Sequence, residues 1–266
     1  MTDVVVDGAG PIGIVRLNRP HLGNSVTPEV VTRLGEAVRE LGDVDAVRAI
    51  VLTGTGSVFC AGADVREMHA IFREQGADGF VQYHVDVWWP AVQSAVRALW
   101  SVPKPLVAAL NGAATAGGLD FALACDSRVA ATTARFAESY VHLGMVPVAG
   151  GAFLLPLVVG LPNALRLLAS GEFIDAERAL SIGLVDEVCA TDVLDTRAAE
   201  MAERLAEGPA RTFALTKQIA RRAATEELER ALQDSYQANV ELLELDEVRD
   251  RVVAVMERYG ARVAVD

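Results

Sequence analysis

The sequence lacks any long apolar run that is free of charges and helix breakers. Its two most apolar stretches, around 105–119 and 143–162, are interrupted by Asn111, by several glycines, and by Pro147 and Pro156. A membrane-spanning helix needs roughly 20 apolar residues. The amino terminus MTDVVVDG carries acids and lacks the basic-then-apolar pattern of a secretion signal. We therefore expect no membrane span and a location in the cytoplasm.

Cysteine and histidine are scarce. The cysteines are odd in number, far apart and set in apolar surroundings: Cys60, Cys125 and Cys189. This usage favours buried free thiols in a reducing compartment over a disulfide framework or a metal site. The histidines show no HExxH or other ligand spacing: His21, His69, His84 and His142. Metal catalysis is therefore not expected.

Basic residues are outnumbered by acidic ones. The chain has 24 Lys and Arg against 36 Asp and Glu, a formal net charge of −12. This charge argues against nucleic acid and anionic membranes as partners. It does not exclude an anionic ligand, because a few local cations and helix N-termini can hold phosphates. The remaining composition, 52% hydrophobic and 23% charged over 266 residues, is that of an ordinary globular protein.

The first part of the chain alternates predicted strands with predicted helices. We expect strands at 3–7, 12–18, 48–53, 105–112 and 127–131. We expect helices at 27–42, with Thr27 as N-cap, Pro28 at the first position and Gly42 as the stop, and at 82–100 and 117–125. Strands that alternate with helices imply crossover units and buried parallel pairing, and hence an α/β fold.

The second part is predominantly helical. Helices are expected at 162–169, 175–182, 192–207, 209–224, 226–243 and 246–259, with one strand at 183–188. No linker, low-complexity tract or internal repeat separates the two parts. We therefore predict one domain, with an α/β core over 1–190 and a helical region over 191–266.

Two turns rich in small residues stand where buried strands give way to helices. The first is FCAGADVREM (59–68), and its GTG prefix is not a dinucleotide fingerprint because Phe59 stands where the third glycine would be. The second is NGAATAGGLDFALACD (111–126). Small residues let the backbone approach a ligand, and the first N–H groups of a helix have no internal partner. Each turn could serve packing alone, but two such N–H groups that converge on one oxygen form an oxyanion hole.

Five runs together resemble the crotonase (enoyl-CoA hydratase/isomerase) superfamily. They are LNRPHLGNSV (17–26), FCAGADVREM (59–68), PLVAALNGAATAGGLDFALACD (105–126), FAESYVHLGMVP (136–147) and GEFIDAERALSIGLVDEV (171–188). The resemblance covers roughly 4–225 in order, whereas the ending DEVRDRVVAVMERYG (246–260) follows the family only loosely. It is specific to the superfamily and much less specific to the reaction.

The resemblance implies a fold, a ligand and an assembly. The fold is a spiral of ββα turns with a C-terminal helical trimerisation region, built into homotrimers or hexamers. The substrate is an acyl-CoA thioester, so coenzyme A arrives with the substrate and no separate cofactor is expected. The N–H groups of Ala63 and Gly117 would bind the thioester oxygen. The coenzyme A channel would be lined by Ala63, Asp64, Val65 and Arg66.

The reactive positions depart in part from those of hydratases in this family, which place two glutamates beside the substrate. The first position holds Asp120, an acid/base candidate or a simple helix-start acid. The second holds Tyr140, a poor base at neutral pH that can donate a hydrogen bond or stack on an acyl group. A further acid, used by isomerases and dehalogenases, is absent because Val148 stands there. Glu138 lies two residues before Tyr140, and its role stays open.

Further polar and aromatic residues surround these motifs. His142 is a catalytic or a structural histidine, and the roles of His69 and His84 stay open. Aromatic side chains near them could bind a bulky acyl group or could simply pack a helix face: Tyr83, Trp88 and Trp89. An apolar stripe on the C-terminal helices supports self-association, because one core would leave it uncovered: Leu228, Leu232, Tyr236 and Val240.

The sequence therefore predicts an acyl-CoA-processing enzyme whose reaction is hydration, double-bond isomerisation or C–C cleavage, including decarboxylation. All three share a thioester enolate and differ in how protons are delivered. With Asp120 alone able to ionise at the expected places, we predict weak hydration of short enoyl-CoA esters. A non-catalytic acyl-CoA-binding protein is the alternative, and retention of Asp120 argues against it. RNA binding, known in some family members, conflicts with the charge of −12.

Overall fold

The computed structural model describes residues 2–8 and 10–263, with side chains as far as Arg258. Its strands are β1 (Val4–Asp7), β2 (Ile12–Leu17), β3 (Ala49–Gly54), β4 (Val58–Cys60), β5 (Leu106–Leu110), β6 (Ala113–Thr115), β7 (Ser127–Ala131), β8 (Arg135–Ala137), β9 (Ile174–Asp175) and β10 (Glu187–Cys189). Its α-helices are α1 (Pro28–Asp43), α2 (Val65–Tyr83), α3 (Trp89–Ser101), α4 (Gly117–Ala124), α5 (Gly151–Val159), α6 (Leu161–Ser170), α7 (Ala176–Ser181), α8 (Leu194–Leu205), α9 (Ala210–Leu242) and α10 (Asp246–Val263). Short helical turns complete the set: η1 (Pro20–Leu22), η2 (His84–Trp88), η3 (Ser139–Leu143) and η4 (Thr191–Val193).

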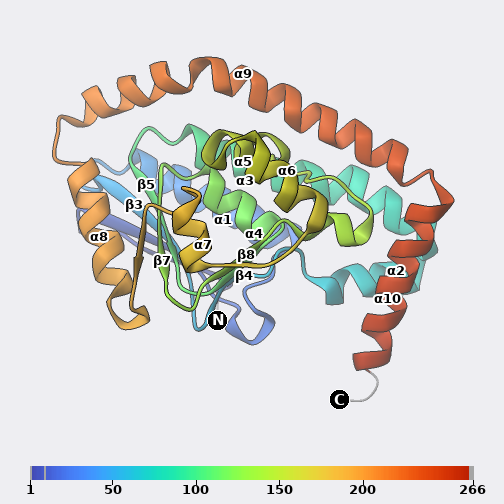
Figure 1. Ribbon diagram of the computed structural model, residues 1–266. Helices are drawn as coiled ribbons and strands as arrows, with labels where there is room; N and C mark the ends of the chain where they lie inside the picture. Colours follow the sequence, from blue (N-terminus) through green and yellow to red (C-terminus); the bar gives the residue numbers. More distant parts are fainter. Residues whose placement is uncertain (1, 9, 264–266) are drawn as a thin grey trace.

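The strands of the described chain form two sheets that are wound as a spiral. The larger sheet has the order β1-β2-β3-β5-β7-β10 and is parallel from β2 to β10. The smaller sheet has the order β4-β6-β8-β9, with β8 and β9 antiparallel. After α1, successive turns of the chain place one strand in each sheet and then a helix, as in β5, β6 and α4 (Figure 1). This arrangement confirms the predicted α/β spiral of ββα turns.

Side chains that alternate along the central strands serve two separate cores. Ile50 and Leu52 of β3 join the main core, while Val51 points to the opposite face of the sheet. There it packs with one side of α8, through Leu194 and Ala198. A strand that is buried on both faces needs a continuous apolar run, which is why AIVLTG contains no charge.

The C-terminal helices wrap around this spiral. α9 arches over the molecule as one helix of 33 residues, and α10 then descends beside α2 (Figure 1). The prediction of two helices at 209–224 and 226–243 was therefore wrong. Thr225, the residue between them, donates its hydroxyl to the Arg221 carbonyl and accepts the indole N–H of Trp100. The Thr225 hydroxyl is thus satisfied within a helix that runs on without a break.

Two other helix boundaries differ from the prediction. Gly42 lies inside α1 and does not stop it, although Thr27 caps that helix as expected and accepts from the N–H of Val30. The helix predicted at 82–100 is joined to α2 through the π-helical turn η2. A π turn has no distinct hydrophobic period, so it cannot be recognised from the apolar spacing.

The stripe that was expected to need a partner subunit is covered within the chain. Leu228 and Leu232 are buried in the main core, and Tyr236 and Val240 pack against it. The inference from this stripe to self-association was therefore wrong. Large apolar side chains are instead exposed on α5 and α6, where Leu157, Leu161 and Leu165 are each more than half exposed.

The three cysteines lie among the described residues and differ in burial. Cys60 and Cys125 are buried free thiols as predicted, whereas Cys189 on the edge strand β10 is only half-buried. Within residues 2–8 and 10–263, no helix is both long and apolar enough to cross a bilayer.

Candidate active site

The turn after β4 presents the backbone N–H of Ala63 to a cavity. Ala63 pairs with Val26 in an isolated parallel bridge. In this bridge Val26 donates to the carbonyl of Gly62 and accepts from the N–H of Asp64, both at 2.9 Å. Successive N–H groups of an extended segment point to opposite sides, so the N–H of Ala63 points away from Val26. The structure gives that N–H no backbone acceptor among the described residues.

The second N–H belongs to Gly117, the first residue of α4. The residue before it, Ala116, has φ 48° and ψ −124°, a conformation that alanine rarely adopts and that costs about 1–3 kcal/mol. The Gly117 N–H has no helical partner because it opens the helix. A Cβ atom built on Gly62 would lie 3.8 Å from the Gly117 nitrogen, so the two turns are in contact. The strained Ala116 thus comes directly before Gly117, whose N–H lies beside the turn that contains Gly62.

Close packing of backbones brings these two turns together. A Cβ atom on Gly118 would lie 2.3 Å from the carbonyl oxygen of Cys60, well inside van der Waals contact. Only glycine lets α4 approach β4 this closely. The same approach places the start of α4 next to the chain that leaves β4 toward Ala63.

Ala63 and Gly117 both line a cavity of about 140 Å³. Its lining combines small residues from the two turns with aromatic and apolar side chains, among them Ala63, Gly117, Trp88, Trp89, Tyr140 and Met145. Of the predicted channel residues, Val65 also lines it. Asp64 is buried, pairs with Arg19 at 2.8 Å and caps α2 by accepting from the N–H of Arg66. The Asp64 carboxylate therefore organises the turn, and Arg66 is exposed at its edge.

Asp120 and Tyr140 meet behind the turn that opens α4. The Tyr140 hydroxyl donates to Asp120 Oδ2 at 2.8 Å, and it lies 3.5 Å from where a Cβ atom on Gly117 would stand. Tyr140 lines the cavity, whereas Asp120 is fully buried and lies one layer behind it. Burial raises the pKa of Asp120 to about 7, although its hydrogen bonds with Tyr140 and Glu138 oppose the rise. Burial and the charge of Asp120 also raise the pKa of Tyr140 well above its usual range, so the phenol keeps its proton.

Glu138 is the residue whose position the sequence did not predict. It lies just before η3 and is 1% exposed. Burial and the neighbouring charge of Asp120 raise the pKa of Glu138 well above its usual range. The only sequence signal was an acid two residues before Tyr140. The backbone there is irregular, so neither a strand period nor a helix period predicts which way the Glu138 side chain points.

The histidines divide between the cavity and the surface. His84 lines the cavity, is buried, and places Nδ1 2.7 Å from the carbonyl oxygen of Phe80. Burial lowers the pKa of His84 to about 4, so the ring is neutral, with its proton on Nδ1. His142 is exposed and its Nε2 lies 3.2 Å from the carbonyl of Gly171, a loop contact. His69 lies on α2 and does not line the cavity.

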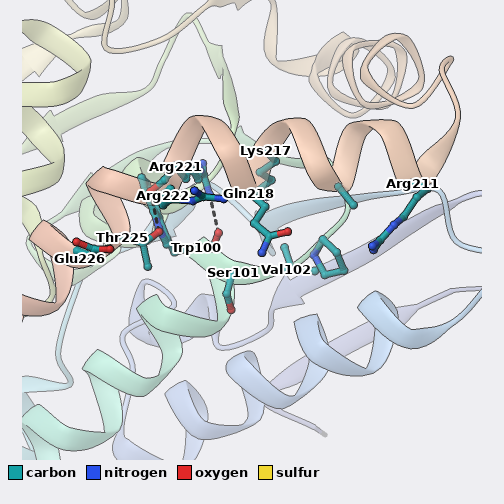
Figure 2. Close-up of a pocket in the computed structure, with 12 residues that line it drawn as sticks. Trp100, Ser101, Val102, Arg211, Lys217, Gln218, Arg221, Arg222, Thr225 and Glu226 are labelled. Atoms are coloured by element: carbon teal, nitrogen blue, oxygen red, sulfur yellow. Dashed lines mark hydrogen bonds between the residues drawn. The ribbon is translucent and has the colours of Figure 1, made fainter.

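A larger hollow of about 490 Å³ lies between α9 and the end of α3 (Figure 2). Two of its basic side chains, Lys217 and Arg221, have structural partners. Asp126 binds Lys217 at 2.7 Å and Arg221 at 2.9 Å, and the Arg221 guanidinium stacks 3.8 Å over the Trp100 ring. These contacts tie α9 to the core, so we place the chemistry in the smaller cavity.

The described residues offer no group of three or more His, Cys, Asp or Glu side chains that could hold a metal ion. The chemical resources of the smaller cavity are therefore its two backbone donors, the Tyr140 hydroxyl and the carboxyls behind it. Such a set can stabilise negative charge on a carbonyl oxygen and move a proton near it.

Comparison with known proteins agrees with this geometry. Residues 8–262 match the family described as enoyl-CoA hydratase/isomerase. The chain is 30% identical to the short-chain-enoyl-CoA hydratase of Clostridium acetobutylicum over 260 residues, 97% of this chain and 96% of that protein. It is 35% identical to the probable enoyl-CoA hydratase EchA17 of Mycobacterium tuberculosis over 216 residues, 80% and 79% of the two chains. The crystal structure of an enoyl-CoA hydratase/isomerase from Pseudoalteromonas atlantica superimposes with a TM-score of 0.83 at 30% identity, covering 97% and 98% of the two chains.

Proposed function

The chain belongs to the enoyl-CoA hydratase/isomerase family, and from this premise we propose that it moves a proton on the acyl group of a coenzyme A thioester through an enolate intermediate. The observation that carries the proposal is the Tyr140 hydroxyl, which lines the cavity beside Gly117 while it donates to the buried Asp120. This arrangement favours double-bond isomerisation over hydration.

The two backbone donors supply the stabilisation of the enolate. When a C–H bond next to a thioester breaks, its electrons move to the thioester oxygen. The N–H groups of Ala63 and Gly117 border the cavity where that oxygen would lie. Fixed donors in a dry site stabilise the developing charge more than they stabilise the neutral substrate, and each is worth about 10²–10³ in rate.

The proton leaves the substrate through Tyr140. As the substrate proton moves to the Tyr140 oxygen, the phenol's own proton moves along the 2.8 Å hydrogen bond to Asp120 Oδ2. The reverse transfer then protonates a different carbon of the enolate. A pKa of about 7 for Asp120 lets it accept and return the proton near neutral pH. Tyr140 thus touches the substrate, and Asp120 holds the proton behind it.

Hydration of an enoyl-CoA requires more acid/base groups than this site provides. It needs one group to orient and deprotonate the attacking water and another to deliver a proton to the α-carbon. The Tyr140–Asp120 pair is one proton relay, and Asp120 is fully buried behind Tyr140, so this pair does not supply the two separate groups. We therefore expect hydration of a short enoyl-CoA to be at least about 10²-fold slower than double-bond movement, since mispositioned groups cost about that factor.

We infer further that the protein works as a homotrimer or hexamer in the cytoplasm. Support for assembly comes from the family membership and from the exposed leucines of α5 and α6. Support for the compartment comes from the three free cysteines.

The test compares two substrates of equal chain length. Wild-type enzyme is given a 3-enoyl-CoA, whose conversion to the conjugated ester raises enoyl absorbance, and crotonyl-CoA, whose hydration lowers it. We expect the first rate to exceed the second by at least about 10². Asp120→Asn should abolish most of the first rate and leave ester binding within a few-fold. Faster hydration than isomerisation would show that another residue serves the water and would overturn the proposal.

A further inference from the structure

Two buried carboxyl groups lie side by side behind the cavity. Asp120 is 0% and Glu138 1% exposed. A Cβ atom built on Gly151, the first residue of α5, would lie 2.1 Å from Asp120 Oδ1 and 2.9 Å from Glu138 Oε1. The two oxygens therefore border the same point in space, and glycine at 151 keeps that point free.

As carboxylates, these two groups would have one hydrogen-bond donor on their four oxygens, the Tyr140 hydroxyl at Asp120 Oδ2. Asp120 Oδ1 and both Glu138 oxygens receive no N–H or O–H from other residues of the described chain. Within the part of the chain that the structure describes, the titratable groups that act on the pair are Tyr140 and the carboxyls themselves, and no cation acts on either. Cys60 of β4 acts only on Tyr140 and keeps its own proton, because burial raises the pKa of its thiol to about 12.

Two adjacent carboxylates cannot both stay ionised in such a place. A single proton held between them removes one charge and gives each group a partner. Only one carboxyl of the pair receives a hydrogen bond from another residue of the described chain, because Tyr140 donates to Asp120 while no donor reaches either Glu138 oxygen. The negative charge is therefore better supported on Asp120, and the shared proton belongs on Glu138. Asp120 accepts the Tyr140 hydroxyl through its other oxygen, Oδ2.

We propose that Glu138 is a protonated positioning residue: it donates to Asp120 Oδ1, so that Asp120 is held between Glu138 behind and Tyr140 in front. The proton on Glu138 is not consumed. During turnover one substrate proton enters the chain at Tyr140, Asp120 Oδ2 receives one, and the Glu138 proton stays where it is. Glu138 thereby fixes which Asp120 oxygen faces Tyr140 and keeps that carboxylate available near neutral pH. The kinetic consequence depends on the proposed function, whereas the protonation state does not.

Two variants distinguish a hydrogen-bonding role of Glu138 from a role in packing alone. Glu138→Gln keeps the shape and an N–H donor toward Asp120, while Glu138→Leu keeps similar bulk and removes the donor. The first readout is infrared difference spectroscopy at mildly alkaline pH, where the carbonyl band of a protonated carboxyl should be present in the wild type. That band should disappear in Glu138→Gln and persist in Glu177→Gln, whose carboxyl is exposed on α7.

The second readout is the pH profile of isomerisation. Glu138→Gln should keep kcat within a few-fold. It should also leave unchanged the pH at which the rate falls on the acidic side of the profile, the acidic limb. Glu138→Leu should lower kcat at neutral pH at least about 10-fold with little change in KM, and should move the acidic limb upward by about one pH unit, because Asp120 has lost a donor to its charged form. Absence of the protonated band in folded wild type would overturn the proposal, as would an unchanged acidic limb in folded Glu138→Leu. If no 3-enoyl-CoA is turned over but the band behaves as stated, the proposed function fails while the protonated Glu138 stands.

Discussion

Removing only the hydroxyl of Tyr140 tests the proton route most selectively. Tyr140→Phe keeps the ring that lines the cavity and deletes the donor that lies 2.8 Å from Asp120 Oδ2. Two separate losses follow. The substrate loses the group that takes its proton, and Asp120 loses one of the two donors that support its negative charge.

The magnitude follows from these two losses. Removing a positioned acid/base group lowers turnover by about 10²–10⁴. A hydrogen bond to an ionised group is worth about 1.5–3 kcal/mol, and one pKa unit corresponds to about 1.36 kcal/mol. The pKa of Asp120 should therefore rise from about 7 by roughly one to two units. At neutral pH Asp120 would then be mostly protonated, which reduces turnover further.

The assay is the pH profile of 3-enoyl-CoA isomerisation by wild type and Tyr140→Phe, with Tyr236→Phe as the matched control. Tyr236 packs on the core and its hydroxyl makes only a long contact of 3.4 Å with the carbonyl of Val85. The control should keep the wild-type rate and profile. If Tyr140→Phe stays within a few-fold of wild type and its acidic limb does not move, the proton does not pass through Tyr140 and the reasoning is refuted.

Three further predictions concern the oxyanion turn, the buried acid and the assembly. Gly117→Pro removes one enolate donor at a helix start, where proline is normally tolerated, and should lower turnover about 10²–10³-fold; near-normal turnover by the folded variant would contradict this role. Because the folded-state pKa of Asp120, about 7, exceeds its unfolded value of about 3.9, wild type loses stability as pH rises between these values. Asp120→Asn should therefore unfold at the same temperature as wild type in acid and be more stable, by up to about 4 kcal/mol, above neutral pH, and equal melting curves at alkaline pH would count against a raised pKa. Light scattering should find a trimer or hexamer that Leu161→Asp weakens, since Leu161 is 58% exposed, whereas a monomeric wild type would rule assembly out.

The two turns could be predicted from the sequence because their signals are local. Small residues between a buried strand and a helix start are visible in FCAGAD and in TAGGLD, and both turns border the same cavity. The central strands were equally visible, since burial on both sheet faces requires uninterrupted apolar runs such as that of β3. The parallel crossovers followed from the alternation of strands with helices.

The contacts behind the cavity could not be predicted in this way. Glu138 meets Asp120 through an irregular backbone before η3, where neither a strand period nor a helix period relates neighbouring side chains. The sequence prediction divided α9 at Thr225, whose hydrogen bonds with Arg221 and Trp100 only the structure reveals. An apolar stripe likewise does not say what covers it, and Leu232 packs on the chain's own core.

The measurement that tests the central claim most directly is exchange of the α-protons of a saturated acyl-CoA in deuterated water, followed by proton NMR. Exchange requires an enolate and a proton route but no double bond, no water addition and no C–C cleavage. We expect wild type to exchange these protons and Asp120→Asn to exchange them at least about 10²-fold more slowly while binding the ester within a few-fold. Ester binding by wild type without any exchange would contradict the account and identify the protein as a non-catalytic acyl-CoA binder.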